Sequence, residues 1–239
     1  MTKDVNARID ELAHALTGAL GTNLTSLVLY GSVARGDYDA KRSDVNLLLI
    51  VQDASPTALA PAGPAIARWA RMGQPPPLMF AAQEWRASTD VFAMEMEEMR
   101  QAHRVLRGDD PFVGLETSPA DVRHELEREA RGKLAHLRAH YAACQSDGRA
   151  LGGLLLNSAK TFFVQFRTLL RLKGTVPPRK LDELVAATAS VVGFDASALA
   201  WVLAKTSGGK APDLKPHDLT GVRYVEAIER VVRFVDEMD

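Results

Sequence analysis

Residues 27–51 read LVLYGSVARGDYDAKRSDVNLLLIV, and this stretch decides the fold expected for the chain. Residues 27–30 and 45–51 are apolar runs with the length and composition of core strands. Between them, Gly31 and Ser32 begin a turn that leads into a polar loop. The pattern predicts two buried strands joined by a loop whose backbone can approach a ligand.

The turn has residues suited to binding phosphate groups. Gly31 has no side chain, so the backbone there can approach a phosphate without a collision. Ser32 offers a hydroxyl and a backbone N–H, and Arg35 can pair with a phosphate or with a nearby aspartate. If residues 33–36 open a helix or a nest of amides, their N–H groups would point at an anion.

Asp44 and Asn46 stand two residues apart at the start of the second strand. Side chains at that spacing lie on one face of a strand, and Val45, Leu47 and Leu49 then lie on the opposite, core face. Two carboxylates at positions 44 and 46 would converge on a pair of metal ions. Asn46 is nearly the same shape as Asp but neutral, so its amide oxygen can coordinate a hard cation without supplying charge.

Together these features resemble the signature of the DNA polymerase β-like nucleotidyltransferase superfamily. The form GSVARG followed by Ser-Asp is similar to its minimal and aminoglycoside branches, and members of the latter carry a C-terminal helical domain. The resemblance implies that Gly31 and Ser32 bind a triphosphate and that Asp44 and position 46 bind Mg²⁺.

The resemblance also implies a third carboxylate on a later strand. We expect residues 90–96 to form that strand because their polarity alternates with a period of two. Glu95 is the best match for the third carboxylate and for a catalytic base, and Glu97 on the same predicted face is its rival.

Asn46 leaves three explanations open. In the first, the protein binds nucleotide or a partner without turnover. In the second, it is active with one metal ion, or with help from Glu97 or Asp37. Alternatively, Asn46 is a deliberate replacement of aspartate. The sequence favours a natural protein with weakened or lost activity.

The rest of the chain predicts an α+β domain with a mixed sheet, followed by an all-α helical bundle. Helices are expected at 5–20 and 66–72, and a further strand at 78–82. From about residue 118 the pattern is helical, with segments expected at 119–145, 150–173, 178–192, 195–206 and 216–238. We place the domains at 1–114 and 115–239, with a cleft between them.

Composition restricts the partners. The net charge of −1 gives no global basic field, so nucleic acid is not an expected partner. The chain has no signal-like start and no apolar run of about 20 residues, so no membrane association is expected. Its single cysteine, Cys144, forms no internal disulfide, which is typical of a cytoplasmic protein. Whether the chain forms a homodimer stays open.

The helical half holds two further candidates. Lys160, Arg167 and Arg171 share one face of a predicted helix, which either holds phosphate groups or is solvated, and we keep Lys160 as a nucleotide-binding candidate. Arg131 and His136 resemble the spacing of the ribonuclease motif of HEPN domains. Because charges in that helix also repeat at i,i+4, structural ion pairs explain Arg131 better.

Two functions of different classes follow. The first is transfer of a nucleoside monophosphate from an NTP·Mg²⁺ complex, with ATP expected, to an acceptor hydroxyl on a small molecule or a protein. Asp44 and Glu95 would then be the catalytic residues. The second is a catalytically silent nucleotide-binding or antitoxin-like partner protein.

Overall fold

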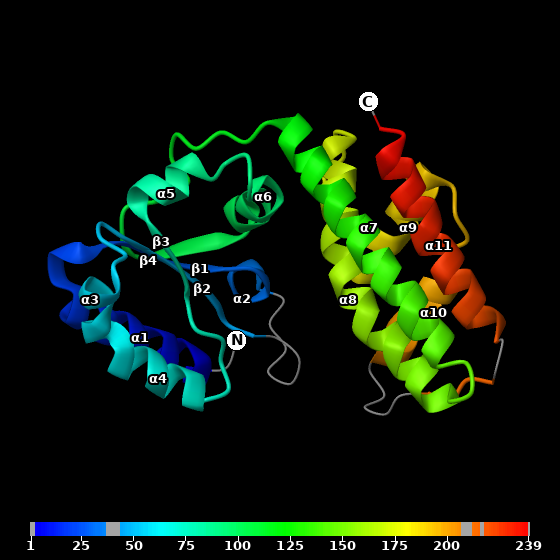
Figure 1. Ribbon diagram of the computed structural model, residues 1–239, viewed down its shortest axis with the longest axis horizontal. Helices are drawn as coiled ribbons and strands as arrows, with labels where there is room; N and C mark the ends of the chain where they lie inside the picture. Colours follow the sequence, from blue (N-terminus) through cyan, green and yellow to red (C-terminus); the bar gives the residue numbers. More distant parts are fainter. Residues whose placement is uncertain (1–2, 37–43, 207–211, 216–217, 239) are drawn as a thin grey trace. The chain divides into compact units, whose positions relative to one another are not determined.

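The computed structural model describes residues 3–36, 44–206, 212–215 and 218–238 (Figure 1). The chain divides into two compact units, Met1–Ser118 and Pro119–Asp239. The first unit combines a sheet with helices, and the described part of the second is built from helices and their connections. The fold is therefore α+β with a mixed sheet, followed by a helical region, as predicted.

The sheet has four strands in the order β3-β2-β1-β4. They are β1 (Leu24–Tyr30), β2 (Asn46–Val51), β3 (Leu78–Ala81) and β4 (His103–Gly108). The central strand β1 runs antiparallel to β2 and β4, whereas β2 and β3 are parallel. The end of β1 therefore lies between the start of β2 and the start of β4.

Helices cover both faces of this sheet (Figure 1). One face packs against α1 (Lys3–Leu20) and α4 (Gly63–Arg71), and the other against α5 (Ala82–Ala87) and α6 (Ala93–Gln101). Short helical segments connect these elements: η1 (Gly21–Asn23), α2 (Ser32–Arg35), α3 (Pro56–Leu59) and η2 (Ala60–Ala62). Helices are needed on both faces because the consecutive apolar residues 27–29 of β1 and 47–51 of β2 are buried on both faces.

Alternate residues of β2 serve different faces, as the period of a strand requires. Leu47 and Leu49, with Val45 just before the strand, join the core beside α1 and α4, which confirms the orientation predicted for them. Leu48 and Ile50 join the core beside α5 and α6. Asn46 has the same side-chain orientation as Leu48 and Ile50.

The strand predicted at 90–96 is wrong, because this segment leads into α6. Ala93, Met96 and Met99 are buried at intervals of three, which fits a helix. The pair Met94 and Met96 alone is too short to distinguish the strand period of two from the helical period. The fourth strand is instead β4. Its sequence HRVLRG mixes charged and apolar residues, as is common at the edge of a sheet, so it gave no strand signal.

The second unit contains α7 (Pro119–Ala143), α8 (Gly148–Leu172), α9 (Leu181–Val192), α10 (Ser197–Thr206) and α11 (Leu219–Asp236). These confirm the five predicted helical segments, with ends shifted by a few residues. Phe162, Phe163, Phe166 and Leu170 are buried, as expected. Within the part of the chain that the structure describes, no helix has both the length and the apolar composition to cross a bilayer.

Candidate functional site

The turn after β1 has a backbone shape that only glycine adopts easily. Gly31 has φ 78° and ψ −144°, which would strain any residue with a Cβ. A Cβ there would also lie 3.2 Å from Nδ2 of Asn46. The N–H of Gly31 donates to the carbonyl of Ala102 at 2.9 Å, so the turn is held against the junction of α6 and β4.

Ser32 and Arg35 are the first and last residues of α2, and both are partly buried. The backbone N–H of Arg35 donates to the Gly31 carbonyl at 3.0 Å, which keeps the short helix against the turn. Asp37, considered above as a helper carboxylate, lies outside the described residues. Both nucleotide-binding candidates in α2 thus lie within one helical turn of Gly31.

Asn46 lies beside this turn. It pairs with Tyr30 across β1 and β2, so its side chain shares a sheet face with those of Tyr30 and Leu48. The backbone N–H of Val45 donates to Oε1 of Gln74 at 2.8 Å, which fixes the entry into β2. Asp44 is exposed and precedes the strand.

Glu95 reaches the same face of the sheet from the first turn of α6. Its Oε2 is buried and has no hydrogen-bond partner among the described residues. Burial raises the pKa of the Tyr30 phenol, and the nearby Glu95 carboxylate raises this pKa further. A buried carboxylate oxygen without a donor is costly, so the position is suited to a ligand that brings a proton or a positive charge.

Glu97 does not share a face with Glu95, which corrects the expectation based on a strand. In a helix, residues two apart point about 200° apart around the axis. Glu97 instead pairs with Arg100, with 2.6 Å between Oε1 and Nη2, and accepts a hydrogen bond from Thr117. Glu97 therefore has structural partners, whereas the buried oxygen of Glu95 has none among the described residues.

The described acidic side chains do not form a preassembled metal cluster. Among residues 3–36, 44–206, 212–215 and 218–238, no cluster of three His, Cys, Asp or Glu side chains can hold a metal ion. Two carboxylates, Asp44 and Glu95, remain, together with the neutral Asn46. Mg²⁺ is commonly bound by one or two carboxylates together with substrate phosphates, so an ion bound by these side chains would need phosphate oxygens as further ligands.

Tyr30 pairs with Asn46 across the strands, and Gln74 bonds the backbone of the preceding residue, Val45; neither was among the residues predicted from sequence. Tyr30 is the last residue of an apolar run and has the appearance of a core residue. Gln74 lies in a connection between α4 and β3, far from Val45 in sequence. The position of Tyr30 opposite Asn46 follows only from the pairing of β1 with β2. No sequence signal identified Gln74.

The basic residues of α8 do not behave as one open surface. Arg167 is buried, 9% exposed, and its Nη2 donates to the carbonyl of Arg179 at 3.3 Å. It therefore fastens the segment that follows α8. Lys160 is exposed on α8, and Arg171 is partly buried.

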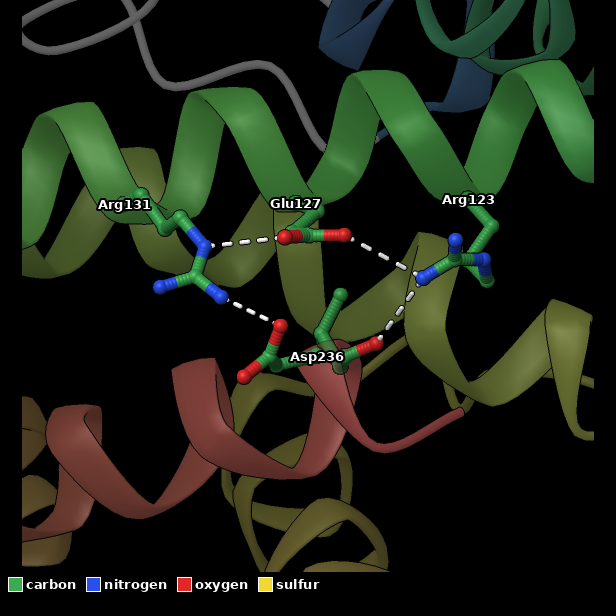
Figure 2. A network of polar contacts seen from close by, with 5 residues as sticks. Arg123, Glu127, Arg131 and Asp236 are labelled. Carbon is green, nitrogen blue, oxygen red and sulfur yellow. Dashed lines mark hydrogen bonds and ion pairs between the residues drawn. The ribbon is translucent and has the colours of Figure 1, made fainter. Parts of the chain in front are cut away.

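Arg131 takes part in ion pairs that join α7 to α11 (Figure 2). Its guanidinium contacts Glu127 at 2.9 Å and also pairs with Asp236. Arg123 donates to the other Glu127 oxygen at 3.2 Å. The ion pairs give Arg131 a structural role in the packing of α7 against α11. Arg131 therefore does not support the ribonuclease motif.

Comparison with solved structures finds a similar fold over nearly the whole chain. The crystal structure of spectinomycin adenyltransferase AAD(9) from Enterococcus faecialis with ATP and spectinomycin matches with a TM-score of 0.56 and 12% sequence identity. The match covers 95% of this chain and 98% of that one. No protein-family model and no curated protein sequence matches. At this identity the comparison shows a shared fold.

Proposed function

We propose that this protein binds a nucleoside triphosphate, expected to be ATP, at the Gly31–Ser32 turn and transfers the nucleoside monophosphate to an acceptor hydroxyl. The observation that carries the proposal is the buried Oε2 of Glu95, which has no hydrogen-bond partner in the described part of the chain. It lies near Tyr30, the residue that precedes the turn. A carboxylate and a phosphate-compatible turn on one sheet face are what nucleotidyl transfer requires.

Each residue has a role in this proposal. Gly31 and Ser32 bind the phosphate groups, while Arg35 offsets their negative charge. The acceptor oxygen attacks the α-phosphorus, its proton passes to Glu95, and pyrophosphate leaves. Asp44, Glu95 and the amide oxygen of Asn46 are the groups that would hold Mg²⁺, which supplies positive charge at the phosphates when bound.

Asn46 lowers the expected rate. A neutral amide in place of a carboxylate attracts a cation less, so the charge that develops on the leaving pyrophosphate is less well balanced. We therefore place this protein among weak transferases. The same residue favours a second candidate, a nucleotide-binding protein without turnover that acts through a partner.

The proposed acceptor is a small molecule that carries hydroxyl groups. The matching solved structure contains ATP and spectinomycin, and its fold is shared over nearly the full length of both chains. A protein acceptor would require a docking surface as well as the site itself. A panel of hydroxylated small molecules, aminocyclitols included, is therefore the first set of acceptors to test.

The test measures pyrophosphate release from ATP and Mg²⁺ by the full chain with this panel, together with the mass of the modified acceptor. We expect slow release, at least tenfold faster release in Asn46→Asp, and none in Glu95→Gln. Turnover that exists only in Asn46→Asp would establish the silent alternative. Failure of both forms to bind any nucleoside triphosphate would show that the site assignment is wrong.

A further inference from the structure

We infer that Asn46 donates its amide N–H to the triphosphate itself, so that this protein binds the nucleotide without needing Mg²⁺. The inference rests on the proposed function, because it concerns the same turn and the same ligand. It changes the role of one residue, from a weakened metal ligand to a direct phosphate ligand. It also separates nucleotide binding from metal binding.

The position of the amide nitrogen carries the inference. Nδ2 of Asn46 lies 3.2 Å from the point that a Cβ on Gly31 would occupy. The amide nitrogen, not the amide oxygen, is therefore the Asn46 atom nearest to the space that Gly31 leaves open. No described residue accepts a hydrogen bond from this nitrogen, and the side chain is partly exposed. Within residues 3–36, 44–206, 212–215 and 218–238, this donor has no acceptor, and it lies beside the open side of the turn.

The chemistry of the group selects an anion. An amide N–H attracts a phosphate oxygen and offers nothing to a cation. A carboxylate at position 46 would repel the triphosphate unless a cation lay between them. With Asn46, the phosphate can approach the turn directly.

Both sides of this contact are held in place before any ligand binds. Gly31 is hydrogen-bonded through its N–H to Ala102. Val45, the residue before Asn46, is hydrogen-bonded through its N–H to Gln74. The backbone on both sides of the contact therefore needs little ordering when a phosphate binds, and only the Asn46 side chain remains to be ordered.

The experiment measures ATP binding to the full chain by calorimetry, in EDTA and in excess Mg²⁺. We expect dissociation constants within about threefold of each other for the natural sequence. In Asn46→Asp we expect binding in EDTA to weaken about tenfold or more, because a donor to a charged group becomes a like charge. Mg²⁺ should restore it.

Gln52→Glu is the matched control. It makes the same amide-to-carboxylate change at an exposed residue just beyond the opposite end of β2. We expect its ATP binding to be unchanged in EDTA. Equal weakening in both variants would overturn the inference, because net charge alone would then explain the effect.

The remaining outcomes are distinct. Binding by the natural sequence only with Mg²⁺ overturns the inference and leaves the proposed function intact. Absence of binding in both conditions overturns the proposed function and the inference with it. If Asn46→Asp does not fold, Asn46→Ala decides, with an expected loss in EDTA of about tenfold. No loss in that variant also overturns the inference.

Discussion

The two faces of the sheet are built from the same strands but differ at the end of β1. Toward α1 and α4, the strand side chains are apolar and closely packed along their length. Toward α5 and α6, the face begins in the same way with Val28 and Leu48 but reaches Tyr30 and Asn46 where β1 ends and β2 starts. One face is an apolar core, and the other combines a core with a polar end.

The difference follows from the period of two along each strand. Leu47 and Asn46 are neighbours in the chain, yet one is in the core and the other lies beside the Gly31 turn. Substitutions on the two faces should therefore have separable effects, the first on folding and the second on ligands.

The largest expected effect is on the apolar face. Leu49 is fully buried there, so Leu49→Ala should lower the free energy of unfolding by about 3 kcal/mol through lost burial and a residual cavity. Chemical denaturation measures this loss. Leu78→Ala, at a site 43% exposed on β3, should cost less than about 0.5 kcal/mol. Similar losses of unfolding free energy in Leu49→Ala and Leu78→Ala would contradict a main role in stability for the face toward α1 and α4.

Gly31→Ala should have an intermediate effect on folding and a larger one on ligands. A Cβ at φ 78° costs about 1–2 kcal/mol and would also press on the Asn46 amide. Gly73→Ala is the control, because Gly73 has φ 79° and no atom within 4 Å of its added Cβ. Denaturation should show a loss of stability in both variants, at least as large in Gly31→Ala because its Cβ also meets Asn46. Calorimetry should show weaker ATP binding only in Gly31→Ala, and equal affinities would argue against a ligand at the turn.

The smallest effect separates two acids of α6. Burial raises the pKa of Tyr30 and the Glu95 charge adds to the rise, so Glu95→Gln should lower this pKa toward its ordinary value. Glu97→Gln should leave the pKa of Tyr30 unchanged, because Glu97 pairs with Arg100. An NMR titration of labelled tyrosine gives both values. A pKa that responds equally to the two variants would place both acids near Tyr30 and remove the distinction.

Most of the fold was predictable from sequence. The alternation of Val45, Leu47 and Leu49, the apolar phases of the long helices and the caps that begin them are local signals, and the structure confirms the elements they predicted. The Gly31 turn was predictable for a similar reason, since a glycine that ends an apolar run marks a special backbone conformation.

The parts that were not predictable depend on contacts distant in sequence. Residues 93–99 fit a strand and a helix almost equally well over so short a length, and only packing on the sheet selects the helix. In the helix, Glu95 and Glu97 point in different directions, whereas in a strand they would have shared one face. The nearness of Tyr30 to Glu95, and of Gln74 to Val45, depends on how β1, β2 and α6 pack together.

The hydrogen bond from Gly31 to Ala102 has a consequence for the energetics of recognition. A loop that is ordered only by its ligand spends part of the interaction energy on losing conformational freedom. Here the turn is ordered when the sheet forms, because its amide is bound to the residue that precedes β4. The entropy of arranging the turn is thus lost during folding, and little of it remains to be lost at each encounter with a ligand.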